Sequence, residues 1–154
     1  MASFFQKISV IVSTGFGIGY LTPIGQGSLD ALAAIFLVRP FLSLSLLSQS
    51  FLILGCLIIG VVASSVAEKK FDKKDDHRIV IDEIISIFIT FWGFESGISV
   101  AVLASGFILN RLLDIWKPFF ISRLQNIHGG WGIMLDDAAS AVISNIVLRM
   151  ILLI

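Results

Sequence analysis

Long apolar runs alternate along the chain with short polar blocks. The longest uncharged run extends from Phe41 to Ala67, and the later runs cover Ile79–Phe94, Ile98–Trp116 and Ile133–Ile154. A helix over the first run would be about 40 Å long, which exceeds the roughly 30 Å hydrocarbon core of a bilayer. The pattern therefore predicts about four membrane-spanning helices.

The first forty residues carry a weaker pattern. Ile8–Leu21 is apolar but rich in glycine, and Leu29–Val38 is too short to cross a membrane. Between them, Thr22–Ser28 (TPIGQGS) contains the proline and glycine residues that mark a loop. Non-helical backbone at membrane depth is tolerated only against protein or water. We therefore expect two short or re-entrant helices around a loop.

Composition supports a membrane protein. Of the 154 residues, 56% are hydrophobic and only 14% are charged, whereas soluble domains carry roughly 25% charged residues. We expect one membrane-embedded domain over residues 1–154, of the all-α class, built as a polytopic helical bundle. The formal net charge is zero, which argues against nucleic acid as a partner.

The distribution of basic residues predicts the orientation of this bundle. Tracing the runs in turn places the polar block Glu68–Arg78 and the loop 118–130 on one membrane face, whereas the opposite face has little beyond Arg39 and Arg149. The basic residues of the first face are Lys69, Lys70, Lys73, Lys74, Arg78, Lys117 and Arg123. By the positive-inside rule this face is cytoplasmic.

The same trace brings distant carboxylates to that face. Three acidic sites are expected at one depth: Asp82 with Glu83, Asp114, and Asp136 with Asp137. Acidic residues are favoured in the first turn of a helix, which accounts for the first and third sites. It does not account for Asp114, near a helix C-terminus. Since five carboxylates together repel one another, we expect Arg111, Lys117 or a divalent cation among them.

Such a cluster suits phosphate chemistry. Mg²⁺ prefers oxygen ligands and often shares its site with phosphates, and a bound metal polarises phosphoryl oxygens and lowers the pKa of an attacking water. We expect all five carboxylates to be catalytic, with four of them as metal ligands: Asp82, Glu83, Asp114 and Asp137. Arg111 and Lys117 are expected to hold phosphate oxygens.

Two glycine-rich segments are further candidates for phosphate contact. Gly27 and Ser28 would add donors if Ser28 caps the following helix, although a tight turn is the simpler interpretation. His128, in HGGWGIMLDD (128–137), is a candidate to meet the phosphate and to protonate the leaving group.

Four blocks carry a resemblance to a known family. They are GFGIGYLTPIGQGS (15–28), IVIDE (79–83), RLLDIWKP (111–118) and HGGWGIMLDD (128–137). In this order and spacing they resemble bacterial phosphatidylglycerophosphatase A over most of the chain. The resemblance implies a Mg²⁺-dependent phosphatase of the inner membrane, with its active site facing the cytoplasm, that converts phosphatidylglycerophosphate to phosphatidylglycerol.

The resemblance also places residues. The family motif positions would be occupied by Asp82, Glu83, Arg111, Asp114, Lys117, Asp136 and Asp137. The first block departs from the pattern P-x-x-P-G-T-x-G-S of relatives. Gln26 replaces the second proline, Ser28 the threonine, and Asp30 and Ala31 the glycine and serine.

Two other functions stay open from the residues alone. Intramembrane carboxylates often mark ion paths, which would make the chain a small transporter or channel, although the acidic sites gather at one face. A non-catalytic membrane scaffold derived from the enzyme is the second alternative, because the first block is altered. The sequence does not indicate an oligomeric state.

Overall fold

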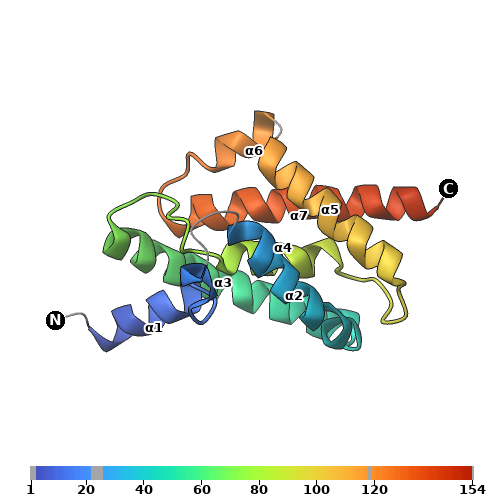
Figure 1. The fold of residues 1–154 in the computed structure, drawn as a ribbon, viewed down its shortest axis with the longest axis horizontal. Helices are drawn as coiled ribbons and strands as arrows, with labels where there is room; N and C mark the ends of the chain where they lie inside the picture. Colours follow the sequence, from blue (N-terminus) through green and yellow to red (C-terminus); the bar gives the residue numbers. More distant parts are fainter. Residues whose placement is uncertain (1–2, 22–25, 118, 154) are drawn as a thin grey trace.

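The computed structural model describes residues 3–21, 26–117 and 119–153, which form seven α-helices, one short 3₁₀ helix and no strand (Figure 1). The helices are α1 (Phe4–Ser13), η1 (Ile18–Tyr20), α2 (Gln26–Leu42), α3 (Leu46–Phe71), α4 (Ile81–Thr90), α5 (Val100–Trp116), α6 (Phe119–Leu124) and α7 (Gly130–Leu152). The predicted all-α class is confirmed.

Helix α4 lies at the centre of the bundle, where it contacts α2, α3, α5 and α7. Helix α7 follows the long axis of the molecule and also packs on α3 and α5, whereas α1 packs on α3 (Figure 1). Ile85 and Ile87 of α4, and Phe91 directly after it, are buried against apolar side chains of the surrounding helices. This central helix carries two of the predicted site residues at its N-terminal end.

The long apolar run from Phe41 forms parts of two helices rather than one. Helix α2 ends at Leu42, and α3 begins at Leu46 after the capping residue Ser45, whose hydroxyl accepts a hydrogen bond from the Ser48 N–H at 3.2 Å. A side-chain oxygen at this position satisfies one of the unpaired N–H groups of a helix start. Helix α3 then continues into the charged block and ends before Asp72.

Helix α4 is shorter than its apolar run predicts. Its 10 residues correspond to about 15 Å, half of a hydrocarbon core. The chain turns away after Thr90, and its carbonyls there find donors on α7. The Asn145 amide donates to the carbonyls of Ile89, Thr90 and Trp92 at 3.3, 2.9 and 3.0 Å. A helix that ends inside a bundle is stable only with such partners.

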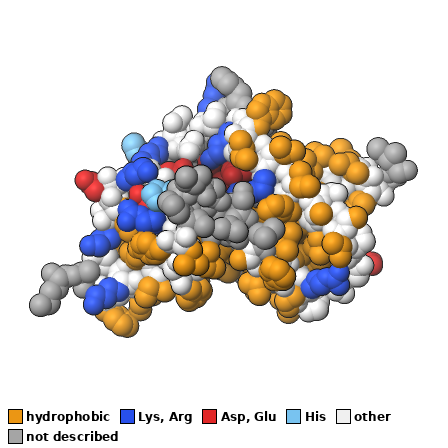
Figure 2. Space-filling model, in the orientation of Figure 1, with side chains coloured by type: hydrophobic (Ala, Val, Ile, Leu, Met, Phe, Trp, Pro, Cys, Tyr) orange, Lys and Arg blue, Asp and Glu red, His pale blue; other side chains and the backbone are white. Residues whose placement is uncertain are grey.

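Within the described ranges, α3 is the one helix that is long and apolar enough to cross a membrane. The four-span arrangement is therefore not confirmed. Figure 2 nonetheless shows hydrophobic side chains over much of the right and lower parts of the face, whereas basic and acidic side chains gather mainly toward the upper left. Large exposed hydrophobic residues include Phe36, Phe51, Ile58 and Ile115.

Candidate active site

Side chains from four separate parts of the chain line one cavity of about 240 Å³. They come from the loop 72–80, from the start of α4, from the end of α5 and from α7. The lining residues are Asp75, His77, Ile79, Asp82, Glu83, Asp114, Lys117, Asp136 and Asp137. Six of these carry carboxylates, so the cavity is strongly acidic.

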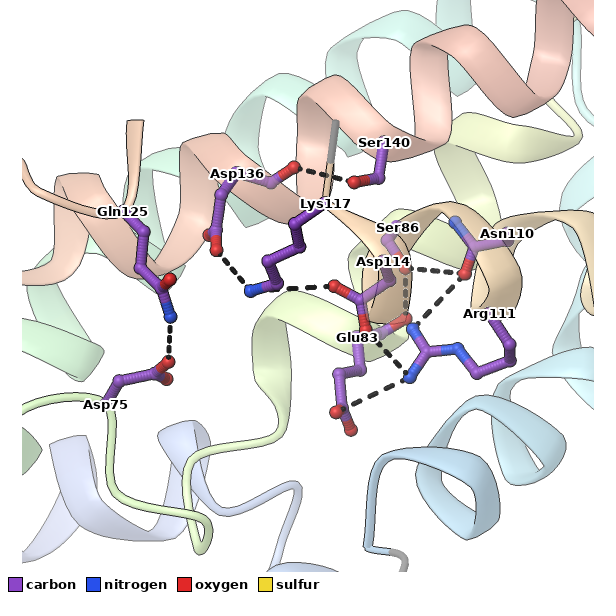
Figure 3. Close-up of polar contacts among 10 residues, drawn as sticks. All are labelled: Asp75, Glu83, Ser86, Asn110, Arg111, Asp114, Lys117, Gln125, Asp136 and Ser140. Carbon is purple, nitrogen blue, oxygen red and sulfur yellow. Dashed lines mark hydrogen bonds and ion pairs between the residues drawn. The ribbon is translucent and has the colours of Figure 1, made fainter. Parts of the chain in front are cut away.

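Arg111 forms one positive centre beside the cavity. Its guanidinium lies 3.5 Å from Glu83 Oε1 and 3.4 Å from Asp114 Oδ2 (Figure 3). Arg111 also donates to Asn110 Oδ1 at 3.2 Å, and the Ser86 hydroxyl donates to the same oxygen at 3.3 Å. The arginine is only 8% exposed, and its contacts with both α4 and α5 fix its position.

Lys117 forms the second positive centre, between Asp114 and Asp136 (Figure 3). It follows α5 in a left-handed conformation with φ 40°. Its Nζ donates to Asp136 Oδ2 at 2.6 Å and lies 3.8 Å from Asp114 Oδ1. Burial lowers the pKa of Lys117, but the hydrogen bond to Asp136 and the surrounding carboxylates outweigh burial and raise it. The side chain is therefore an ammonium at neutral pH.

The loop 72–80 supplies Asp75 and His77. Asp75 has a positive φ of 48° and accepts a hydrogen bond from the Gln125 amide at 3.0 Å. Positive φ is uncommon outside glycine and often marks a functional site. Between the two lining residues, Asp76 is held by Arg78, whose Nε and Nη2 donate at 2.6 and 3.0 Å. These hydrogen bonds lower the pKa of Asp76, despite its burial.

The glycine-rich turn before α7 lets that helix approach α3. Gly129 has φ 71°, and the Gly130 N–H donates to Ser65 Oγ at 2.8 Å. A Cβ atom at Gly130 would lie 2.1 Å from the Val61 carbonyl oxygen, so only glycine fits. The turn thereby seats the beginning of α7, and with it the aspartates further along, against α3.

Because α7 begins at Gly130, Asp136 and Asp137 lie nearly two turns inside it. The expectation that they open the helix was wrong, and the helix dipole acts mainly within the first turn. Asp136 and Asp137 are 2% and 4% exposed. Buried carboxylates at these positions must be paired with a positive group or be protonated, because the helix terminus is too far away to stabilise their charge. The first-turn placement of Asp82 and Glu83 in α4 is confirmed.

The structure brings most of the predicted site residues together. Those that line the cavity are Asp82, Glu83, Asp114, Lys117, Asp136 and Asp137. Arg111 lies beside them, whereas His128 is exposed and is not among the lining residues. Its role, like the catalytic roles of the others, stays a prediction.

The structure differs from the prediction that Ser28, in the first glycine-rich segment, caps the following helix. Gly27 and Ser28 lie in the first turn of α2, which begins at Gln26, so Ser28 is not the capping residue. The surroundings of Gly27 and of the Ser28 side chain lie outside the described residues.

Sequence reasoning missed several residues around the site. They are Asp75, His77, Ser86, Asn110 and Gln125. Asp75 and His77 belong to a block of alternating charges, in which no local pattern separates a lining residue from a surface one. Asn110 next to Arg111, within an otherwise apolar run, was the available signal for a buried polar contact.

The acidic residues of the cavity offer oxygen atoms to a metal ion. Within the described part of the chain, no group of three or more His, Cys, Asp or Glu side chains is positioned as a ready-made metal site. However, Asp82 Oδ1, Asp136 Oδ1 and Asp137 Oδ2 are buried without a hydrogen-bond partner among the described residues. Mg²⁺ usually binds through one or two carboxylates plus water and phosphate, so these oxygens fit it without a closed cage.

Comparison with known proteins decides the family. The family model for phosphatidylglycerophosphatase A matches residues 11–152. The chain belongs to the phosphatidylglycerophosphatase A family. Phosphatidylglycerophosphatase A of Escherichia coli (strain K12) is 37% identical over 137 residues, which cover 87% of this chain and 77% of the relative. The predicted resemblance and the predicted enzyme class, a phosphatase, are confirmed.

Two other relatives cover nearly the whole chain. Phosphatidylglycerophosphatase A of Haemophilus influenzae is 32% identical over 92% of this chain and 90% of its own length. A protein of Bacteroides thetaiotaomicron named as a putative phosphatidylinositol-3-phosphatase is 28% identical over 92% of this chain and 91% of its own length. No solved structure matches the chain significantly.

Proposed function

We propose that this phosphatase removes the terminal phosphate of phosphatidylglycerophosphate, with Mg²⁺, at the cytoplasmic face of a bacterial inner membrane that it crosses several times. The observation that carries the proposal is the acidic cavity, which is lined by the Lys117 ammonium and flanked by the Arg111 guanidinium. It lies in a chain that matches phosphatidylglycerophosphatase A over residues 11–152. The similarity to the Escherichia coli and Haemophilus influenzae enzymes supports the substrate.

The charges of the cavity define what the substrate must meet. A phosphate monoester carries roughly −1.5 to −2 charges at neutral pH, and it would enter a space lined by six carboxylates. Arg111 and Lys117 alone do not balance that charge. Asp82, Glu83, Asp114 and Asp137 would hold Mg²⁺. When bound, Mg²⁺ would polarise the phosphoryl oxygens and lower the pKa of the attacking water.

In this proposal Arg111 and Lys117 bind the phosphate oxygens. The Arg111 guanidinium is held by Glu83 and Asp114, and its planar fork suits two phosphate oxygens at once. Lys117 is an ammonium at the edge of the same cavity and offers a point charge to a third. We propose that water attacks phosphorus directly. Its proton passes to a carboxylate of the cavity, and the bond to the glycerol oxygen breaks as that oxygen takes a proton from solvent.

The test uses purified protein in detergent micelles. Released phosphate is measured from phosphatidylglycerophosphate with Mg²⁺ and with a chelator, for wild type, Asp82→Asn and Asp137→Asn. The matched control is Asp72→Asn, the same chemical change at an exposed position outside the cavity. We expect metal-dependent release that falls at least 100-fold in both site variants and stays normal in the control. Metal-independent release, or full activity of Asp137→Asn, would refute the proposed role of the cluster.

Two further arms separate the alternatives. Phosphatidylinositol-3-phosphate is offered as a second lipid, because one relative carries a name for that activity. Preference for it over phosphatidylglycerophosphate would overturn the proposed substrate. No release from either lipid, combined with ion flux in liposomes, would favour a transporter, and neither activity would favour a scaffold.

The membrane topology is tested separately. Cys56 is the single native cysteine, so it is replaced by serine. Single cysteines are then placed at the exposed positions Asp72 and Gly97, before and after α4. A membrane-impermeant thiol reagent should label Gly97→Cys in intact spheroplasts and Asp72→Cys only after the membrane is opened. Equal labelling of both positions would contradict the proposed orientation.

A further inference from the structure

A second cavity lies between α1 and the end of α3, away from the acidic site. It has a volume of about 300 Å³ and is lined by Gln6, Lys7, Val10, Ile11 and Lys70. Because α1 packs along α3, the cavity forms a groove between two neighbouring helices. We call it the α1–α3 groove. None of its lining residues belongs to the acidic cavity.

The groove combines apolar walls with positive charge. Val10 and Ile11 contribute aliphatic surface, and Lys7 and Lys70 flank them with exposed side chains. Neither lysine has an ion-pair partner among the described residues. Lysine side chains cover apolar surface with their stems while the ammonium reaches toward water. An occupant with an apolar chain and an anionic head satisfies both features.

The neighbouring surface of α1 also suits a lipid. Phe4 and Phe5 are 80% and 59% exposed, while Ser9 and Ser13 face the protein interior. A short helix with aromatic residues on its outer surface and lysine beside them is typical of a segment at a membrane interface. The groove would therefore open where phospholipid headgroups meet their acyl chains.

We propose that the α1–α3 groove binds one anionic phospholipid, with its negatively charged headgroup on Lys7 and Lys70 and one acyl chain over Val10 and Ile11. The groove is connected to the acidic cavity through shared packing. Val10 packs against a small apolar cluster that includes Ile79, and Ile79 lines the acidic cavity. A lipid in the groove would thus stabilise α1 against the wall of the active site without touching the reacting groups.

The test titrates detergent-solubilised protein with phosphatidylserine or phosphatidylcholine and follows bound lipid by native mass spectrometry. Phosphatidylserine is chosen because it is anionic but is neither the proposed substrate nor the proposed product. Wild type should bind it in preference to phosphatidylcholine. Since a basic residue near a lipid surface is worth roughly fivefold in binding, Lys7→Gln with Lys70→Gln should weaken it about 25-fold.

Two variants make the test specific to the groove. Lys69→Gln with Lys73→Gln removes the same charge at exposed positions outside the groove and should leave binding nearly unchanged. Ile11→Trp keeps the charge but fills the groove, and it should weaken binding at least fivefold. All variants should keep their turnover of a short-chain substrate in micelles. Equal loss in the Lys69/Lys73 control, no loss in Ile11→Trp, or equal binding of phosphatidylcholine would overturn the proposal.

Discussion

Replacing Gly130 by alanine tests whether the close approach of α7 to α3 sets up the site. The added methyl group would lie 2.1 Å from the Val61 carbonyl oxygen and 2.9 Å from Ser65 N and Oγ. Real Cβ atoms essentially never come closer than 3.0 Å to such neighbours. The start of α7 must therefore move by about 1 Å, which also disturbs the hydrogen bond from Gly130 N to Ser65 Oγ.

The size of the effect follows from this displacement. Forcing extra volume into a packed contact costs about 1–3 kcal/mol, so the free energy of unfolding should fall by that amount. Asp136 and Asp137 lie further along the same helix, and a 1 Å misplacement of catalytic groups costs on the order of 100-fold in rate. We expect turnover to fall by about that factor, with a smaller effect on substrate affinity.

The assay is phosphate release in micelles together with thermal unfolding in the same detergent. Gly55→Ala is the matched control, because a Cβ at Gly55 in α3 meets nothing within 4 Å. That change should leave activity intact and stabilise the helix by about 0.5–1 kcal/mol. If the Gly130→Ala variant turns over substrate and melts like wild type, the turn does not position α7 for catalysis.

Three further predictions concern single polar contacts. Lys117→Met leaves the buried Asp136 carboxylate without its 2.6 Å partner, so unfolding in denaturant should show a loss of about 3 kcal/mol, and Lys117→Arg should recover part of it. Asp76→Asn removes a carboxylate whose pKa is lowered by Arg78. The variant should therefore melt at a lower temperature than wild type above about pH 4, and this difference should disappear as the pH falls through the lowered pKa of Asp76 in the folded protein. Asn145→Leu removes the donor to three carbonyls at the end of α4, which should lower stability by about 1–3 kcal/mol, measured by thermal melting.

Much of the site could be predicted because its carboxylates interrupt otherwise apolar runs of the chain. Carboxylates are costly in apolar runs, so Asp114 and Asp137 stand out as residues that need a partner. Tracing the runs from side to side put them at one end of the bundle, and the cavity contains both. The direction of successive helices was therefore enough to predict which acidic residues meet.

Other features depended on contacts that no local pattern records. Helix α4 is short because Asn145, 55 residues further on, satisfies the carbonyl of Thr90. Asp75 reaches the cavity because a left-handed backbone and Gln125 hold it there. Both arrangements depend on side chains from distant segments, whose positions follow from packing rather than from periodicity.

The sequence by itself determined the helical class, the family and the end of the bundle where charge gathers, because hydrophobic periodicity and motif spacing are written along the chain. The tertiary structure decided where helices stop and which charges pair. It placed Arg111 between Glu83 and Asp114, and Lys117 on Asp136. Those pairings arise only when buried carboxylates, removed from water, must find positive partners within a few ångströms.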